Sequence, residues 1–276
     1  MRLEFAGIRR KTEFSPNHEV NDLLIINQTA EILRQMGAEV NLYDEDGLDK
    51  EIVKENLIFS MVQGPKGIDQ LLKLSKKQPL IINSPESVYS CYRSNMLKLL
   101  PDGGIPIPKS LIVATDITMN GEMSQFSSPK IWVKRSDVHA VRQGDVTFVD
   151  LEEEILNCTL KDFKSRQIEK VILQEHIQGD TVKFYAVRET NFFFWYYTDK
   201  KSGSVFIINR LKELANAASE ILGLYIYGGD AIISPDGSIT IIDINDWPSF
   251  APIRDEASKH ISQLLYRKAE EYVNRS

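Results

Sequence analysis

The sequence predicts an α/β protein in which an N-terminal α/β module is followed by two α+β subdomains. Short apolar runs alternate with amphipathic stretches through the first third of the chain, as in βα units around a largely parallel sheet. A Pro- and Gly-rich segment at 101–108 interrupts this pattern, and the last hundred residues begin with closely spaced strands. With 276 residues, of which 42% are hydrophobic, the chain can bury a core of ordinary size.

The first 83 residues carry the signals of the α/β module. Apolar side chains recur at helical spacing from 20 to 36, and Gly37 is a natural stop for that helix. Ser84 before Pro85 is typical of a helix start, because a serine side chain caps free backbone amides. The expected strands are 3–8, 38–43, 56–62 and 79–82, and the expected helices are 20–36, 68–75 and 88–100.

The rest of the chain divides into a connecting segment and two further units. Pro101 begins the stop after the connecting helix, and Pro235-Asp236-Gly237 is a strong turn signal between two late strands. The expected units are 1–83, 84–114, 115–178 and 179–276. The expected strands are 110–114, 131–135, 145–149, 171–174, 181–189, 191–198, 229–234 and 238–244, with helices near 152–157, 211–222 and 255–273.

Composition and charge exclude several classes of function. The chain has 39 acidic and 33 basic residues, a net charge of -6 and no Lys/Arg block, which argues against a dedicated nucleic-acid binder. No apolar run approaches the roughly 20 residues of a membrane span, and the first residues lack the apolar stretch of a signal peptide. We therefore expect a cytoplasmic protein without a membrane partner. Cys91 and Cys158 have no spacing typical of a disulfide framework or a zinc site.

Three oxygen-bearing side chains near the late hairpin indicate a metal site. Period-2 alternation places Asp243 and Asn245 on one face of a strand, with Ile242 and Ile244 on the other. The hairpin brings Asp230 on the partner strand close to Asp243, and oxygen ligands of this kind suit Mg²⁺, with Mn²⁺ as an alternative. The competing interpretation is that these are strand-end polar residues in solvent.

This arrangement, together with the motifs upstream of it, resembles the ATP-grasp superfamily. The likeness is to carboxylate-amine ligases, such as those that add glutamate to ribosomal protein tails and glutathione synthetase, with some likeness to inositol trisphosphate 5/6-kinases. It implies a pre-ATP-grasp domain, a lid subdomain and a C-terminal subdomain, in that order. It also implies that Asp230, Asp243 and Asn245 hold one or two Mg²⁺ ions on ATP. Asp243 stands where the superfamily usually has Glu.

The resemblance assigns further residues to the nucleotide. Lys134 follows an apolar strand and matches the lysine that reaches the ATP phosphates. Glu175 matches the acid of the hinge, in which backbone groups at His176 and Ile177 read adenine. Asp180 matches the acid that accepts ribose hydroxyls, and a simple turn residue is the alternative. The full expected set is Arg93, Lys134, His139, Gln174, Glu175, His176, Ile177, Asp180 and Lys183.

A basic residue is also expected in the helix before the lid. Arg93 and Lys98 are the candidates, and the leucine spacing favours Arg93. Leu97, Leu99 and Leu100 follow it at +4, +6 and +7, as leucines follow the lysine of the glutamate-adding ligases. Arg in place of Lys is a departure from the pattern, although both side chains bind phosphate oxygens.

The resemblance also proposes catalytic groups. Lys183 lies where related enzymes carry a cation beside the phosphates or the substrate, and Arg210 where carboxylate ligases place an arginine that steadies the acyl-phosphate. The phosphate-covering loop, 137–144, is poor in glycine, which leaves His139 and Arg142 to supply donors. We expect this loop to be mobile and to order over bound nucleotide.

The leading functional expectation is an ADP-forming ligase that joins a small-molecule or peptide carboxylate to an amine acceptor through an acyl-phosphate. Lys134 and His139 are five residues apart, as in the inositol-phosphate kinases, which makes a small-molecule kinase the second hypothesis. A nucleotide-binding protein without turnover is the third, because of the glycine-poor loop and Asp243. Neither the substrates nor an oligomeric state follows from the sequence.

Overall fold

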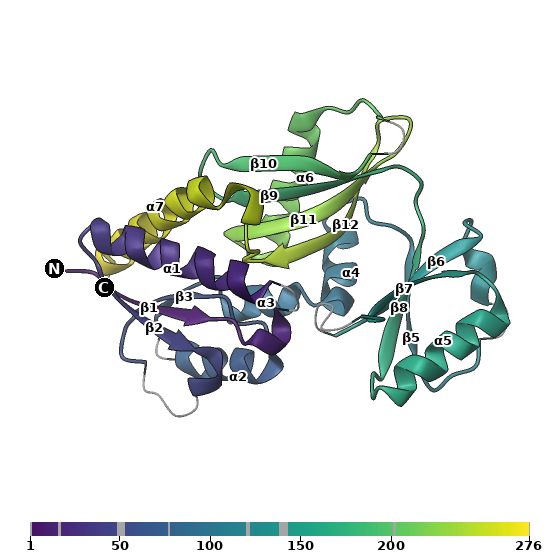
Figure 1. Ribbon diagram of the computed structural model, residues 1–276, viewed down its shortest axis with the longest axis horizontal. Helices are drawn as coiled ribbons and strands as arrows, with labels where there is room; N and C mark the ends of the chain where they lie inside the picture. Colours follow the sequence, from purple (N-terminus) through teal and green to yellow (C-terminus); the bar gives the residue numbers. More distant parts are fainter. Residues whose placement is uncertain are drawn as a thin grey trace.

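The computed structural model describes residues 2–15, 18–48, 53–76, 78–119, 122–137, 143–200 and 203–275. It contains three four-stranded sheets, which confirms the predicted α/β class (Figure 1). In Figure 1 the N-terminal module is at the lower left, the C-terminal sheet above it, and the lid sheet at the right. No helix in the described residues is long and apolar enough to cross a membrane.

The N-terminal module is a parallel sheet with the strand order β2-β1-β3-β4. Its strands are mostly buried, as expected for a parallel sheet that is covered by helices. The elements are β1 (Glu4–Arg9), α1 (Glu19–Gln35), β2 (Glu39–Asp44), β3 (Leu57–Ser60), α2 (Pro65–Ser75) and β4 (Leu80–Ile82), with 3-10 turns at Thr12–Phe14 and Glu45–Gly47.

The predicted connecting helix is in fact two helices, α3 (Pro85–Ser90) and α4 (Arg93–Asp102). The Ser84 side chain caps α3 as expected, accepting a hydrogen bond from the Ser87 backbone N–H at 3.2 Å. The break between the helices lets α4 begin at Arg93, whose side chain is buried.

The lid is an antiparallel sheet with the strand order β5-β8-β6-β7. One face packs on α5 through an apolar cluster that includes Ile131, Val133 and Leu173. The residues that alternate with these, Trp132 and Gln174 among them, therefore lie on the opposite face. The elements are β5 (Ser110–Ala114), a 3-10 turn at Glu122–Gln125, β6 (Lys130–Arg135), β7 (Val146–Asp150), α5 (Glu153–Ser165) and β8 (Lys170–Glu175).

The C-terminal sheet is antiparallel with the strand order β10-β9-β11-β12. Helix α6 covers one face of it, where Val182, Phe184 and Ala231 join the helix in an apolar cluster. Helix α7 crosses back to pack on α1 of the first module. The elements are β9 (Asp180–Val187), β10 (Phe193–Asp199), α6 (Ile208–Leu222), β11 (Ile226–Ile233), β12 (Ile239–Asp246), a 3-10 turn at Ala251–Ile253 and α7 (Arg254–Val273).

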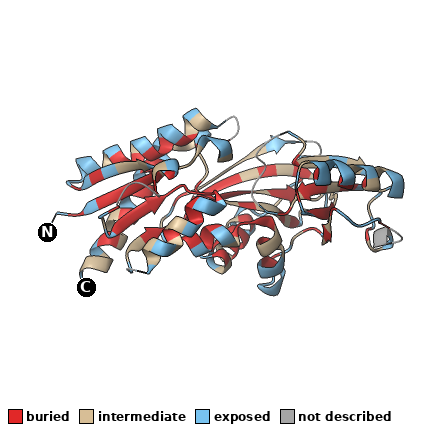
Figure 2. Ribbon diagram, turned by 90° about the horizontal axis from the view of Figure 1, so that it is seen from below, coloured by how far each residue is buried: buried red, intermediate tan, exposed pale blue. Residues whose placement is uncertain are grey.

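The first module and the C-terminal sheet are joined by Arg10 and a buried tryptophan. The Arg10 guanidinium binds Asp22 (2.8 Å), the carbonyl of Met61 (3.0 Å) and the carbonyl of Trp247 (2.9 Å). The Trp247 ring is fully buried and stacks on Phe59, with 5.9 Å between ring centroids. The continuous buried interior of these two units is visible in Figure 2.

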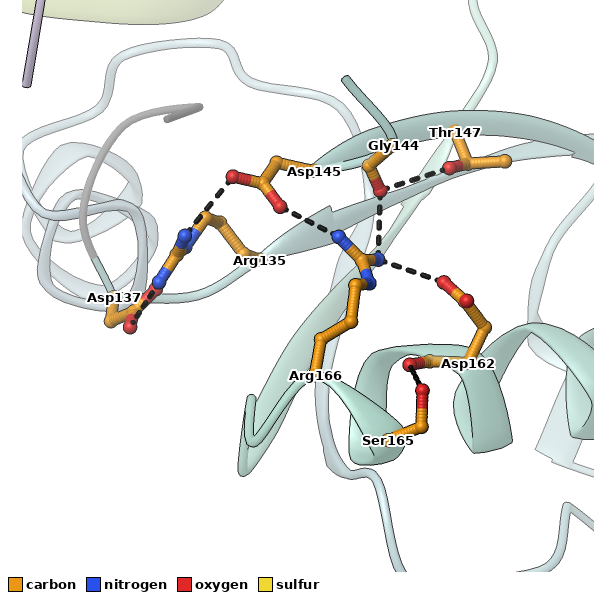
Figure 3. A network of polar contacts seen from close by, with 8 residues as sticks. All are labelled: Arg135, Asp137, Gly144, Asp145, Thr147, Asp162, Ser165 and Arg166. Carbon is orange, nitrogen blue, oxygen red and sulfur yellow. Dashed lines mark hydrogen bonds and ion pairs between the residues drawn. The ribbon is translucent and has the colours of Figure 1, made fainter. Parts of the chain in front are cut away.

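The end of the lid sheet is held by a buried carboxylate between two arginines (Figure 3). Asp145 is fully buried and accepts from Arg135 at 3.0 Å and from Arg166 at 2.8 Å. Arg135 also binds Asp137, and Arg166 binds the carbonyl of Gly144 at 2.9 Å. The network therefore ties β6, the start of β7 and the end of α5 together.

We expect Asp145→Asn to destabilise the lid sheet by about 3 kcal/mol, because it removes one charge from a buried ionic network and leaves the guanidinium groups undercompensated. The matched control is Asp150→Asn on β7, whose pair with Lys130 is half exposed and should contribute less than about 0.5 kcal/mol. Native-state hydrogen exchange of the β6 and β8 amides measures both changes. Equal losses in the two variants would contradict this account of the network.

Candidate active site

A cavity of about 520 Å³ lies between the inner face of the lid sheet and the C-terminal sheet. Lid strands β6, β7 and β8 line one side of it, and strands β9, β11 and β12 line the other. The structure brings many of the sequence-predicted residues together here. Those that line the cavity are Arg93, Lys134, Gln174, Glu175, His176, Ile177, Asp230 and Asp243.

Two carboxylates stand side by side on the floor of the cavity. Asp230 on β11 is directly opposite Asp243 on β12 in the strand register. Lys183 Nζ lies 3.0 Å from Asp230 Oδ1, and Arg93 Nη2 lies 3.4 Å from Asp243 Oδ2. Burial raises the pKa of Asp230, and the neighbouring Asp243 adds to the rise, while Lys183 and Lys134 oppose it. Each carboxylate therefore has a cation next to it.

The β11–β12 pairing contains a bulge that corrects the predicted alternation. Asp230 pairs with Asp243, but the next residue, Ala231, pairs with Ile241, so Ile242 is an extra residue. Ile242 consequently lines the cavity beside Asp243 instead of facing the other side of the sheet. Asn245 lies two residues beyond Asp243, opposite Gly228, and is not part of the cavity wall.

The donor set on this floor fits a hard divalent cation that keeps part of its hydration. Among the described residues, no group of three or more His, Cys, Asp or Glu side chains is placed to hold a metal ion. The predicted trio offers two carboxylates and, further along β12, one amide oxygen: Asp230, Asp243 and Asn245. Mg²⁺ is commonly bound by one or two carboxylates, with water and phosphate oxygens as its other ligands.

Two buried cations face these carboxylates from outside the C-terminal sheet. Lys134 on β6 is 8% exposed and donates to Gln174 Oε1 at 2.6 Å. Burial, reinforced by the positive charge of Arg93, lowers the pKa of Lys134 to about 8. Arg93 is 7% exposed, and its Nε and Nη1 atoms are buried without a hydrogen-bond partner in the part of the chain that the structure describes. Such unmade bonds on a buried guanidinium favour an anion in the cavity.

Gln174 and Glu175 on the hinge strand both line the cavity, but the Glu175 carboxylate is bonded to the lid backbone. The Glu175 carboxylate accepts hydrogen bonds from the backbone N–H groups of Ser127 (2.6 Å) and Ser128 (3.1 Å), which lie before β6. The two side chains point to opposite faces of β8 because successive residues of a strand alternate. The Glu175 carboxylate therefore organises the lid, and its expected place in the adenine hinge stays a prediction.

An aromatic wall is the feature that sequence reasoning missed. Trp132 lies in register between Phe148 on β7 and Gln174 on β8, with 4.5 Å between the Trp132 and Phe148 ring centroids. The Trp132 indole N–H donates to His176 Nδ1 at 3.3 Å, and the Phe148 and His176 rings meet edge to face. Trp132 is two residues before Lys134, so strand alternation alone could have assigned it to the same face.

Some predicted residues lie elsewhere. Asp180 is fully buried, and its carboxylate accepts from the Ser204 backbone N–H at 2.8 Å on the α6 side of β9. The Lys183 side chain lies on the opposite face of β9 from Asp180, on the cavity side, where it binds Asp230. Asp199, which the sequence reasoning did not select, lines the cavity from the end of β10, opposite Thr181.

Arg210 does not line the cavity. It is exposed on α6, which covers the opposite face of the C-terminal sheet, and it pairs with Glu213 at 3.2 Å. Arg210 is not among the residues that line the cavity, so this structure does not support the catalytic expectation for it. His139 and Arg142 fall outside the described residues, so the expectations for them and for their loop stay predictions.

At the sequence level, no protein-family model and no curated protein matches the chain. Solved structures do match over nearly its whole length. D-alanine–D-alanine ligase from Bacillus anthracis in complex with ATP has a TM-score of 0.72 at 14% identity and covers 98% of this chain and 99% of its own.

Two other similar structures are ligases that are named for, or were solved with, other molecules. The VanG D-Ala:D-Ser ligase from Enterococcus faecalis has a TM-score of 0.71 at 15% identity, over 96% of this chain and 98% of its own. The ATP-grasp ligase PsnB with a minimal precursor has a TM-score of 0.64 at 15% identity, over 97% and 99%. The protein therefore has the fold of the ATP-grasp ligases.

Proposed function

We propose that the protein is an ATP- and Mg²⁺-dependent ligase that activates a carboxylate as an acyl-phosphate and transfers it to an amine, with release of ADP. The observation that carries the proposal is the composition of the cavity: Arg93 and Lys134 line it together with the paired carboxylates. The carboxylates are Asp230 and Asp243, and Lys183 pairs with Asp230. Cations around an acidic floor are the arrangement needed to hold a metal-bound polyphosphate.

The cavity offers separate places for the parts of ATP. Trp132 and Phe148 form an apolar wall for the base, near the backbone of His176 and Ile177. Asp199, at the end of β10, would accept the ribose hydroxyls in place of Asp180, because the Asp180 carboxylate already accepts a hydrogen bond from the Ser204 backbone N–H. Lys134 and Arg93 lie deeper, beside the two carboxylates, where the phosphates would bind.

Asp230 and Asp243 would hold the Mg²⁺, which would neutralise phosphate charge and fix the geometry for in-line attack. A carboxylate substrate attacks the γ-phosphorus; a P–O bond forms to the carboxylate oxygen, and the bond to the ADP oxygen breaks. An amine then attacks the acyl carbon and expels phosphate. Arg93, Lys134 and Lys183 stabilise negative charge on the oxygens throughout, and no side-chain nucleophile is needed.

The similar structures support a substrate class. Two are named as ligases that join D-alanine to D-alanine or D-serine, and PsnB was also solved with a precursor peptide. An amino acid or peptide carboxylate with an amine acceptor is therefore the proposed substrate pair. A kinase acting on a polyol phosphate is the alternative, because Arg210, the residue expected to steady an acyl-phosphate, is not among the residues that line the cavity.

The proposed reaction predicts Mg²⁺-dependent ADP release that requires both an amino acid or peptide carboxylate and an amine. Purified protein is incubated with ATP, Mg²⁺ and pooled D- and L-amino acids and dipeptides, and ADP and new amides are detected by mass spectrometry. ADP release that needs only a phosphorylated polyol would replace the ligase by the kinase. ATP binding with no turnover in any pool would leave a nucleotide-binding protein.

Asp230→Asn and Asp243→Asn are each expected to weaken Mg²⁺-dependent ATP binding at least about tenfold, because a neutral amide is a poorer Mg²⁺ ligand than a carboxylate. Calorimetric titration with and without Mg²⁺ measures the effect. Asp236→Asn is the control: this carboxylate is exposed in the turn of the same hairpin and caps Ser238. The metal assignment fails if the gain in ATP affinity on adding Mg²⁺ is the same in all four proteins.

ATP affinity should fall as the pH rises through about 8, the lowered pKa of Lys134. The ammonium form binds phosphate, so above this pH binding must take up a proton, and affinity at pH 9 should be about tenfold weaker than at pH 7. Lys134→Met should bind weakly at both pH values, whereas Lys164→Met, on the exposed side of α5, should behave as the wild type. A pH dependence that persists in Lys134→Met would assign it to another group.

A further inference from the structure

A chain of hydrogen bonds connects the edge strand of the lid to the phosphate-side lysine. Ser110 Oγ donates to the carbonyl of Pro108 at 2.8 Å, and Gln174 Nε2 donates to Ser110 Oγ at 3.3 Å. The other end of the Gln174 amide, Oε1, accepts from Lys134 Nζ at 2.6 Å. Ser110 and Gln174 are directly opposite each other on β5 and β8, neighbouring strands in Figure 1.

The direction of these bonds is fixed by chemistry at both ends. The Pro108 carbonyl can only accept, so the single hydroxyl hydrogen of Ser110 points to it, and Ser110 can only accept from Gln174. The Lys134 ammonium can only donate, so it requires the amide oxygen. Both ends thus force the Gln174 nitrogen toward Ser110 and its oxygen toward Lys134.

The result is a donor and an acceptor side by side in the cavity wall. Lys134 has two N–H bonds besides the one given to Gln174, and Gln174 Oε1 has a second lone pair. Gln174 is 4% exposed and lies next to Trp132, the residue proposed to pack on the base. A base stacked there would therefore present its edge to the pair formed by Lys134 and Gln174.

This pair matches one purine and not another. Adenine shows an amino donor at position 6 beside the N7 acceptor, whereas a 6-oxo purine shows two neighbouring acceptors. With adenine, the amino group meets Gln174 Oε1 and N7 meets Lys134. With a 6-oxo purine, two carbonyl oxygens would face each other, unless the amide turned over and gave up its bonds to Ser110 and Lys134.

We propose that Ser110 is a positioning residue for nucleobase specificity: by fixing the Gln174 amide, it makes the cavity select a 6-amino purine over a 6-oxo purine. Ser110 does not line the cavity and acts only through Gln174. The inference rests on the proposed function, because it assumes that a purine nucleotide occupies the cavity.

The test compares the binding of ATP with that of inosine triphosphate, in which a 6-oxo group replaces the 6-amino group, in the presence of Mg²⁺. Calorimetric titration measures both affinities in the wild type, Ser110→Ala and Ser110→Thr. We expect the wild type to prefer ATP by about ten- to a hundredfold. Ser110→Ala should lower this preference, because Lys134 alone then orients the Gln174 amide, and Ser110→Thr, which keeps the hydroxyl, should retain it.

A second variant covers the case in which Ser110→Ala does not fold. Gln174→Met keeps the length of the side chain but has neither donor nor acceptor, so the ratio of the two affinities should fall close to one. Equal wild-type affinity for the two nucleotides, or an unchanged ratio in either loss variant, overturns the role of Ser110 and leaves the ligase proposal standing. Failure of the wild type to bind either nucleotide overturns the proposed function itself.

Discussion

The register of the β11–β12 hairpin places two carboxylates next to each other, and the surrounding structure compensates their charge. Asp230 and Asp243 are paired across adjacent strands, so each raises the cost of ionising the other. Lys183, from β9, neutralises the first, and Arg93, from the start of α4, neutralises the second. The break between α3 and α4, which puts Arg93 at a helix start, therefore serves the same purpose as the strand register.

The same charges explain how the ion pairs inside the cavity could be replaced by contacts with a ligand. Lys183 and Arg93 now act as the counterions of the acidic floor. A divalent cation on the carboxylates would take over this role and free both side chains for phosphate or substrate oxygens. The unmade bonds of Arg93 and the lowered pKa of Lys134 indicate that this cationic side is incompletely satisfied by the described residues alone. Binding of an anion with its metal would resolve both deficits at once.

Strand periodicity was sufficient to predict much of this site. It located Asp230 and Asp243 on one face, and it placed Lys134 at the end of an apolar strand. It was misleading at Ile242, where a bulge adds one residue. The expectation for Asp180 came from the family resemblance instead, and the structure places the Asp180 carboxylate on the Ser204 backbone N–H. The role expected of Arg210 also came from the resemblance. A helix pattern shows which side of the helix is apolar, but not which face of the sheet the helix covers, so the sequence could not show that Arg210 would lie outside the cavity lining.

The central claim is that the carboxylate pair holds the metal under the ATP phosphates. It is tested most directly by a crystal structure with Mn²⁺ and a non-hydrolysable ATP analogue, in which anomalous scattering locates the metal. The account predicts a metal peak within coordination distance of both Asp230 and Asp243, with Arg93 or Lys183 turned onto a phosphate oxygen. A metal peak away from these two carboxylates, or a nucleotide bound outside the cavity between the lid and the C-terminal sheet, would contradict it.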